Sequence, residues 1–204
     1  GETLGVIGPT GSGKSTIAQL IVRFFDIDTG SIRFDGIDIR DLRIKDLREQ
    51  IAYVPQDVFL FSETLQENIG FSSDTPISLE TAEAAAEFAA VDDSIRDFPA
   101  QYDTVLGERG VTLSGGQKQR VSLARAIVRE APLLLLDDSL SAVDAKTQED
   151  ILSHIRNLNQ TLLLVSHRVM SVMHADRIIV LEDGRITESG THDELMKRGG
   201  YYAD

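Results

Sequence analysis

The sequence predicts an α/β fold with a mostly parallel sheet and an inserted helical subdomain. Strand-like and helix-like segments alternate along the chain, as they do when helices cover the faces of a parallel sheet. The segments Leu133–Asp137 and Leu162–Ser166 are continuously apolar over most of their length, as strands buried on both faces should be. Between about residues 65 and 128 no strand pattern occurs, and the Ala-rich segment 82–90 favours helix.

The elements follow in order from a first strand at Leu4–Gly8. The helix after it carries apolar residues at helical spacing, which are expected to form one buried face: Ala18, Ile21, Val22 and Phe25. Further strands are expected at Ser31–Asp35, which is half exposed, and at Ile51–Val54 and Ile178–Glu182. The chain is therefore expected to be one domain over residues 1–204. Its α/β core takes in about 1–64 and 129–204, and its helical subdomain about 65–128.

A phosphate-binding P-loop lies between the first strand and the first helix. The residues Gly8-Pro9-Thr10-Gly11-Ser12-Gly13-Lys14-Ser15 fit the pattern G-x-x-x-x-G-K-[ST]. The glycines let backbone N–H groups turn toward phosphate oxygens, and the helix N-terminus adds partial positive charge. Lys14 can reach the β- and γ-phosphates, and the Ser15 hydroxyl can ligate Mg²⁺. The alternative is a Gly-rich turn without a ligand, but the flanking strand and helix favour a nucleotide site.

Two later segments add candidate site residues. Asp137 ends an apolar strand, where P-loop enzymes hold Mg²⁺, although Asp is also common at ordinary strand ends. In Leu113-Ser114-Gly115-Gly116-Gln117, Ser114 is a good helix N-cap. The two glycines cost the helix roughly 1 kcal/mol each relative to Ala, which a merely capped helix does not explain. They indicate a backbone that something must approach closely, and the open N–H groups suit a phosphate.

Composition narrows the class of protein. The net charge of −13 over 204 residues argues against binding nucleic acid or anionic membranes through a basic surface. The chain has no cysteine, which excludes disulfides and Cys-type metal sites. No apolar run approaches the ~18 residues of a membrane helix, and the N-terminus does not read as a signal peptide. Any membrane association is therefore expected to come from another domain or chain.

Taken together, these motifs resemble the nucleotide-binding domain of an ABC transporter. The resemblance implies a P-loop NTPase (RecA-like) core with a mostly parallel sheet and an inserted α-helical signature subdomain. The P-loop, Gln56 after a strand, the signature Leu113–Gln117, Asp137, the segment Ser141–Asp144 and His167 occur in that family's order. Three details resemble exporters: Pro55-Gln56-Asp57 with Leu60-Phe61, the segment Gly107-Glu108-Arg109-Gly110, and the segment Gly190–Leu195.

The resemblance implies roles for individual residues. Gly8 to Thr16 would bind ATP, with Mg²⁺ on Ser15, Gln56 and Asp137. Gln56 would also sense the attacking water and link the site to a transmembrane domain. Ser114, Gly115, Gly116 and Gln117 would bind the γ-phosphate held by a second domain, Asp144 would cross the dimer interface, and His167 would contact the γ-phosphate. Singly, each has a plainer alternative: a loop residue for Gln56, an N-cap of the helix 145–157 for Asp144, and a solvated imidazole for His167.

The chain departs from the family's pattern in three places. Asp138 replaces the usual Glu, so the catalytic carboxylate is retracted by ~1.5 Å. This predicts a weak, degenerate hydrolytic site, the alternative being that Asp138 is a slow base. Val105 stands where exporters commonly carry Glu. Only seven residues precede Gly8, so we expect the adenine-stacking segment and the first antiparallel strands to be missing, and the chain to be part of a longer polypeptide.

The sequence is thus interpreted as the ATPase domain of an ABC exporter, with Asp138, His167 and Gln56 as catalytic residues. It would form a head-to-tail nucleotide-sandwich dimer, preferentially a heterodimer, and drive a transmembrane domain from the cytoplasmic face of a membrane, with no nucleic acid as partner. One alternative is a regulatory ATP-binding module with negligible hydrolysis. Another is a soluble ABC-type ATPase acting on DNA or ribosomes, which the acidic charge disfavours.

Overall fold

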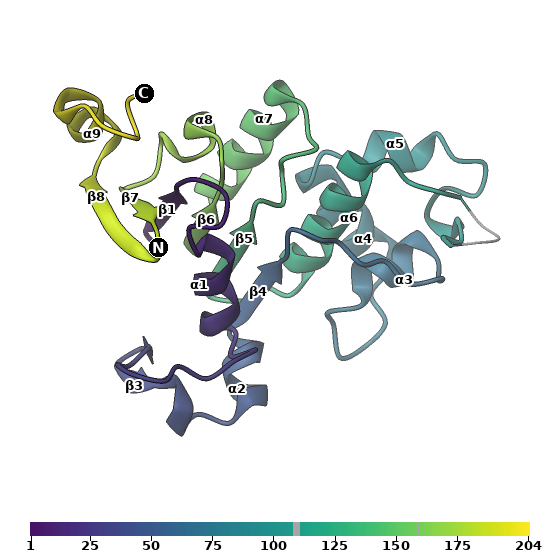
Figure 1. The fold of residues 1–204 in the computed structure, drawn as a ribbon. Helices are drawn as coiled ribbons and strands as arrows, with labels where there is room; N and C mark the ends of the chain where they lie inside the picture. Colours follow the sequence, from purple (N-terminus) through teal and green to yellow (C-terminus); the bar gives the residue numbers. More distant parts are fainter. Residues whose placement is uncertain (108–110, 159) are drawn as a thin grey trace. The chain divides into compact units, whose positions relative to one another are not determined.

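The computed structural model describes residues 1–107, 111–158 and 160–204, which form two compact units. The first unit contains Gly1–Tyr53, Ala131–Asp138 and Gln160–Asp204. The second contains Val54–Glu130 and Ser139–Asn159. Figure 1 shows the course of the chain through both units.

The main sheet has six strands in the order β4-β5-β6-β1-β7-β8. Their bounds are Thr3–Ile7 (β1), Ile51–Val54 (β4), Leu133–Asp137 (β5), Thr161–Val165 (β6), Arg177–Glu182 (β7) and Arg185–Gly190 (β8). The strands β5, β6, β1 and β7 pair in parallel, and β7 pairs with β8 antiparallel. A mostly parallel sheet confirms the α/β prediction.

Two tight turns explain the antiparallel parts of the first unit. The short strands β2 (Arg33–Phe34) and β3 (Ile37–Asp38) form a separate two-stranded sheet. The turn between them is Asp35-Gly36, with φ of 49° and 83°. The turn between β7 and β8 is Asp183-Gly184, with φ of 46° and 73°. Positive φ at both central positions matches the right-handed twist of paired strands, and Asp-Gly is a preferred sequence for it.

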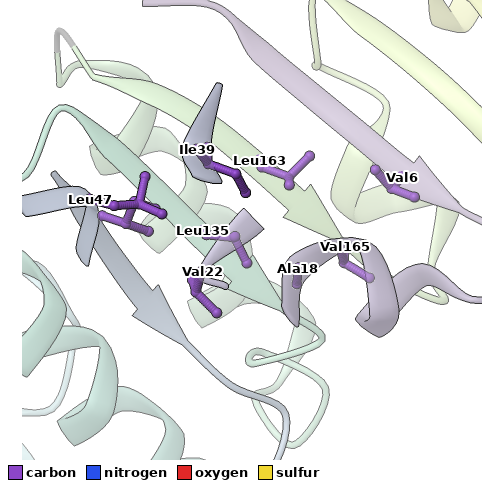
Figure 2. Close-up of a cluster of buried hydrophobic side chains, with 9 residues drawn as sticks. Val6, Ala18, Val22, Ile39, Leu47, Leu135, Leu163 and Val165 are labelled. Carbon is purple, nitrogen blue, oxygen red and sulfur yellow. The ribbon is translucent and has the colours of Figure 1, made fainter. Parts of the chain in front are cut away.

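The helices of the first unit cover both faces of β1. They are α1 (Lys14–Ile21), the 3-10 turn η1 (Ile39–Asp41), α2 (Ile44–Glu49), α8 (Val169–Val172) and α9 (His192–Arg198). On one face lies a buried cluster that Figure 2 shows, which joins β1, α1, η1, α2, β4, β5 and β6: Val6, Ala18, Val22, Ile39, Leu47, Ile51, Leu135, Leu163 and Val165. On the other face, α8 packs so closely on Gly5 that an added Cβ would lie 2.8 Å from the Cβ of Val172.

The second unit is helical. It contains α3 (Leu65–Gly70), α4 (Leu79–Phe88), α5 (Asp92–Arg96), the 3-10 turn η2 (Gln101–Asp103), α6 (Gly115–Val128) and α7 (Ala145–Arg156). The longest of these, α6, packs against α3 and α4. Near the end of α7, a ring nitrogen of His154 lies 3.1 Å from the carbonyl oxygen of Phe88, which ends α4.

Some expected elements differ from the structure. Phe25 does not belong to the buried face of the first helix, because α1 ends at Ile21 and Arg23 takes a left-handed φ of 55°. The Phe25 side chain is 62% exposed as a result. The strand expected at Ser31–Asp35 is limited to β2, since the chain already turns at Asp35. The strands β3 and β8 were not expected from the sequence.

Candidate functional site

The first unit brings three candidate segments to one edge of its sheet. In the register of the strands, Asp137 of β5 lies beside Val165 of β6, and Val165 lies beside Val6 of β1. Because these neighbouring strands are parallel, their carboxyl ends meet at the same edge (Figure 1). The P-loop begins directly after β1. Asp137 is the last residue of β5 and Asp138 follows it, and His167 lies two residues after the end of β6. Open α/β sheets bind ligands at this edge.

The P-loop has the backbone shape that its glycines predict. Gly11 and Gly13 take φ of 82° and 101°, which side chains rarely adopt, and Gly13 is the residue before the first turn of α1. Gly8 is enclosed by β7, since an added Cβ would lie 2.0 Å from the carbonyl oxygen of Leu181. The loop is also supported by the β7–β8 turn, where the N–H of Gly184 donates to the carbonyl oxygen of Ser12 at 3.0 Å.

Lys14 is buried at the start of α1, with 4% of its surface exposed. Its ammonium donates to the carbonyl oxygens of Gly8 and Pro9 at 2.8 and 2.7 Å. Burial lowers the pKa of Lys14, and the nearby charges of Asp138 and Asp137 partly oppose this effect. The direct partners of the cation are thus neutral main-chain oxygens. A bound phosphate would give it a negatively charged partner.

The hydroxyl of Ser15 donates to Oδ1 of Asp137 at 2.9 Å. The other oxygen of the same carboxylate, Oδ2, accepts from the hydroxyl of Tyr53 at 3.3 Å. Burial raises the pKa of Asp137, while the bonds from Ser15 and Tyr53 act in the opposite direction. Burial also raises the pKa of Tyr53, as does the charge of Asp137, so the phenol remains a donor.

These residues fit a nucleotide with Mg²⁺. Within the described residues no group of three His, Asp or Glu side chains is arranged to hold a metal ion. Mg²⁺ at nucleotide sites needs less than that, because one or two protein oxygens act together with phosphates and water. Ser15 and Asp137 offer one hydroxyl and one carboxylate side by side. In addition, the buried hydroxyl of Ser12 in the P-loop has no hydrogen-bond partner.

Asp138 and His167 complete the edge. Asp138 has a left-handed φ of 47°, and its N–H donates to the carbonyl oxygen of Val165 at 2.9 Å. Asp tolerates this backbone conformation better than most residues. His167 is exposed, directly after the buried Ser166.

The second unit contains the other candidate residues. Ser114 caps α6 in a reciprocal arrangement with Gln117: the Ser114 hydroxyl accepts from the Gln117 N–H at 3.2 Å, and Gln117 Oε1 accepts from the Ser114 N–H at 2.9 Å. Asp144 caps α7, with its carboxylate accepting from the Thr147 N–H at 3.0 Å. This hydrogen bond lowers the pKa of Asp144.

The same unit explains the second glycine of the signature. A Cβ at Gly116 would lie 2.7 Å from the carbonyl oxygen of Ala142. Gly116 thus closely approaches the segment just before Asp144, while a phosphate contact of the two glycines stays a prediction. Gln56 is exposed in the loop after β4. Glu108, Arg109 and Gly110 of the exporter-like segment lie outside the described residues.

Sequence reasoning missed two residues. Tyr53 lies three positions before Gln56, but its partner Asp137 is 84 residues away, so no local pattern shows the contact. Gln119 is 7% exposed on α6, and its side chain holds the segment before Asp144. A buried amide within an otherwise ordinary helix gives no signal until its partners are known.

Comparison with known proteins decides the family. Residues 1–141 match the sequence pattern described as ABC transporter. The chain belongs to the ABC transporter family. It is a nucleotide-binding ATPase domain of the exporter type, with the P-loop NTPase fold expected from the sequence.

The similar proteins come from distant organisms. The ATP-dependent lipid A-core flippase of Photobacterium profundum is 45% identical over 205 residues, which cover 100% of this chain and 35% of that protein. The ABC transporter B family member 24, mitochondrial, of Arabidopsis thaliana is 43% identical over 100% of this chain and 30% of its own length. The structure of a bacterial Atm1-family ABC exporter with ATP bound has a TM-score of 0.94 and 43% identity, covering 99% of this chain and 36% of that one.

The chain thus spans about a third of the length of these relatives. Among its described residues, no helix has both the length and the apolarity that crossing a membrane requires.

Proposed function

We propose that this ABC domain binds Mg-ATP at its P-loop and uses binding and hydrolysis to drive export through a transmembrane domain. The observation that carries the proposal is the convergence of Lys14, Ser15 and Asp137 at the edge formed by β5, β6 and β1. The relatives described as an ATP-dependent flippase and an Atm1-family exporter support it.

In this proposal the P-loop residues Gly8 to Thr16 surround the phosphates. Their N–H groups and the start of α1 supply positive potential, and Lys14 exchanges its carbonyl partners for phosphate oxygens. Ser15, Asp137 and Gln56 would hold Mg²⁺, which neutralises charge on the phosphates when bound. Asp138 and His167 would face the attacking water and the γ-phosphate.

We assign Ser114–Gln117 and Asp144 to a nucleotide held by a second, head-to-tail domain, preferentially a different chain. Ser114, Gly115 and Asp144 are exposed in the second unit, so they are accessible to a partner. The start of α6 presents N–H groups after a cap, which suits a phosphate. The degenerate character of Asp138 favours a heterodimer, because a partner with a stronger base would then supply most of the turnover.

A hollow in the second unit supports the proposal that this domain acts with a transmembrane domain. It has a volume of about 360 Å³, and its apolar lining comes from Val58, Phe59, Leu60, Leu106, Val111 and Leu113. Phe59 is 68% exposed at this hollow. An apolar hollow with an exposed aromatic ring suits a protein segment from another domain. The domain would then work at the cytoplasmic face of a membrane, where ATP is present.

The test of the nucleotide site is Lys14→Ala in the full protein, with Lys45→Ala on α2, an exposed lysine outside the proposed sites, as the matched control. We expect Lys14→Ala to abolish tight Mg-ATP binding and turnover, since it removes the buried cation. Titration with ATP and the rate of phosphate release measure the two effects. Unchanged affinity and rate in a folded Lys14→Ala protein would show that the site is elsewhere.

A regulatory ATP-binding module is the second candidate, and Asp138 is the observation that favours it. A shorter carboxylate in place of Glu leaves the general base short of its water by ~1 Å or more. Tight ATP binding without measurable hydrolysis in the complete transporter would favour this candidate over an active ATPase.

A further inference from the structure

We propose that Gln119 is a positioning residue that joins the signature Ser114–Gln117 to the segment Ser141–Asp144. The two segments then move as one piece when they meet a second domain. The inference rests on the proposed function, in which both segments act on the nucleotide of that domain. It assigns Gln119 a role that acts through the two segments rather than through the nucleotide.

The first observation is that both the nitrogen and the oxygen of the Gln119 side-chain amide form hydrogen bonds. Its Nε2 donates to the hydroxyl of Ser141 at 3.2 Å, and its Oε1 accepts from the N–H of Ala142 at 2.9 Å. The side chain is 7% exposed, so water offers little competition for these bonds. A buried amide with both ends paired fixes the orientation of its partners, because either bond broken alone leaves a buried polar group unsatisfied.

The second observation is independent of side-chain polarity. The backbone of α6 approaches the same segment so closely that a Cβ at Gly116 would lie 2.7 Å from the carbonyl oxygen of Ala142. A Cβ at Gly115 would lie 3.5 Å from the Cβ of Ala142. Ala142 is thus packed closely against Gly116 and hydrogen-bonded to Gln119, so a shift of this segment would disturb one of the two contacts.

The third observation is that each of the two segments contains the N-cap of a helix. Ser114 is fixed to α6 by its own cap, and Asp144 is fixed to α7 by its own cap. Val143, between Ala142 and Asp144, is buried. Gln119 therefore sets the position of one cap relative to the other. Because a misplacement of ~1 Å at a reacting group costs about 100-fold in rate, this spacing is worth controlling.

The experiment uses two substitutions of Gln119 in the full protein. Gln119→Met keeps the length of the side chain but removes both hydrogen bonds. Gln119→Glu keeps the side-chain oxygen that accepts from the Ala142 N–H but loses the N–H donor to Ser141. The matched control is Gln66→Met on α3, which removes the bond from Gln66 Nε2 to the carbonyl oxygen of Ile77 at 3.0 Å.

Two measurements are made on each variant. The first is hydrogen exchange at the Ala142 N–H without nucleotide. We expect exchange to accelerate about tenfold or more in Gln119→Met, and to stay near the wild-type rate in Gln119→Glu and Gln66→Met. The second is the split between ATP affinity and turnover in the assembled transporter. We expect Gln119→Met to lower turnover by about tenfold to 100-fold with unchanged ATP affinity at the P-loop, and Gln119→Glu, which keeps the bond to Ala142, to lower turnover less than Gln119→Met does.

Either of two results would overturn the inference. One is unchanged exchange at Ala142 in Gln119→Met. The other is accelerated exchange with normal turnover, which would make Gln119 a structural link and no more. The exchange measurement does not depend on the proposed function: a protein that hydrolyses no ATP at all would contradict that function, while its exchange rates would still test the link between the two segments.

Discussion

Ser15 and Asp137 are joined by a hydrogen bond of 2.9 Å, although 122 residues separate them in the sequence. The bond links the first turn of α1 to the end of β5. Two oxygens that would hold Mg²⁺ are therefore side by side within the folded chain itself. Sites arranged in this way bind without first reorganising their ligands, which lowers the free-energy cost of binding.

The first prediction concerns Tyr53→Phe. The variant keeps the edge-on contact between the rings of Phe24 and residue 53 but loses the hydrogen bond to Asp137 Oδ2. Because the carboxylate then has one fixed partner fewer, we expect the Mg²⁺ concentration for half-maximal nucleotide binding to rise about threefold to tenfold. Binding of ATP without Mg²⁺ should stay unchanged.

The control for Tyr53 is Tyr102→Phe, which removes a hydroxyl that donates to Asp92 at 2.7 Å in the second unit. Titration of fluorescent nucleotide at several Mg²⁺ concentrations separates the two variants. An equal shift in both, or none in Tyr53→Phe, would mean that the phenol does not orient Asp137.

The second prediction concerns Asp138 as the general base of ATP hydrolysis. We expect Asp138→Glu to raise hydrolysis at this P-loop by up to about 100-fold, because the longer side chain returns the carboxylate toward the water. Asp138→Asn should change little if the site is degenerate. The rate is measured in the assembled transporter, with the partner's own base removed so that this site alone contributes.

The backbone at Asp138 requires a control in that experiment. Its φ of 47° is tolerated by Asp and Asn but disfavoured for Glu. Thermal unfolding of the Glu variant therefore accompanies the rate measurement. A large loss of turnover in Asp138→Asn without a gain in Asp138→Glu would indicate a working base adapted to Asp.

The third prediction concerns the signature. Ser114→Arg should leave ATP binding to this chain's own P-loop nearly unchanged and lower hydrolysis at the partner's site, because the bulky side chain fills the space of the γ-phosphate. Ser78, which also caps a helix through its hydroxyl, gives the control Ser78→Arg. Equal loss of binding at both nucleotides in Ser114→Arg would show that the signature acts on its own chain's ATP.

The fourth prediction separates two roles of Asp144. Asp144→Asn keeps an N-cap for α7 but removes the charge, whereas Asp144→Ala removes both. We expect Asn to leave the free energy of unfolding nearly unchanged while lowering ATP turnover in the assembled transporter. We expect Ala to lower both. Normal turnover in Asp144→Asn would leave Asp144 with the role of a helix cap alone.

The same residue gives a pH dependence with a defined sign. Because its pKa in the folded chain lies below the ordinary value of 3.8, the charged carboxylate stabilises the fold. This contribution is complete above pH 3.8 and is lost as the pH falls through the lowered pKa. The difference in unfolding free energy between wild type and Asp144→Ala should therefore shrink in that acidic range, as urea unfolding at several pH values would show.

Local signals explain what the sequence predicted correctly. The P-loop, the strand ending at Asp137 and the cap at Ser114 are each set within a few residues, and the structure has the strand and the cap where the pattern predicted them. The hairpins at Asp35-Gly36 and Asp183-Gly184 carried an equally local signal, so their strands could have been predicted from it. The division into domains and the roles of the site residues stay predictions.

Other features depend on contacts that no local pattern contains. The helix ends before Phe25 although its apolar spacing continues, because the backbone turns at Arg23, whose side chain pairs with Asp26 and with the carbonyl oxygens of Ile39 and Leu42. A side chain at position 116 would collide with the carbonyl oxygen of Ala142. Gly116 comes before β5 in the sequence and Ala142 comes after it, so no local pattern shows this contact. Such long-range packing overrides propensity and is known only from the fold.

Because β7 encloses Gly8, substitutions at Gly8 and at Lys14 should abolish function in two different ways. Alanine at position 8 would place a Cβ 2.0 Å from a main-chain oxygen, so we expect the chain to misfold and be degraded. Alanine at position 14 leaves the backbone intact, and the folded subunit would still occupy its place in an assembly. In a cell with both wild-type and mutant copies, the first allele would therefore be recessive and the second dominant.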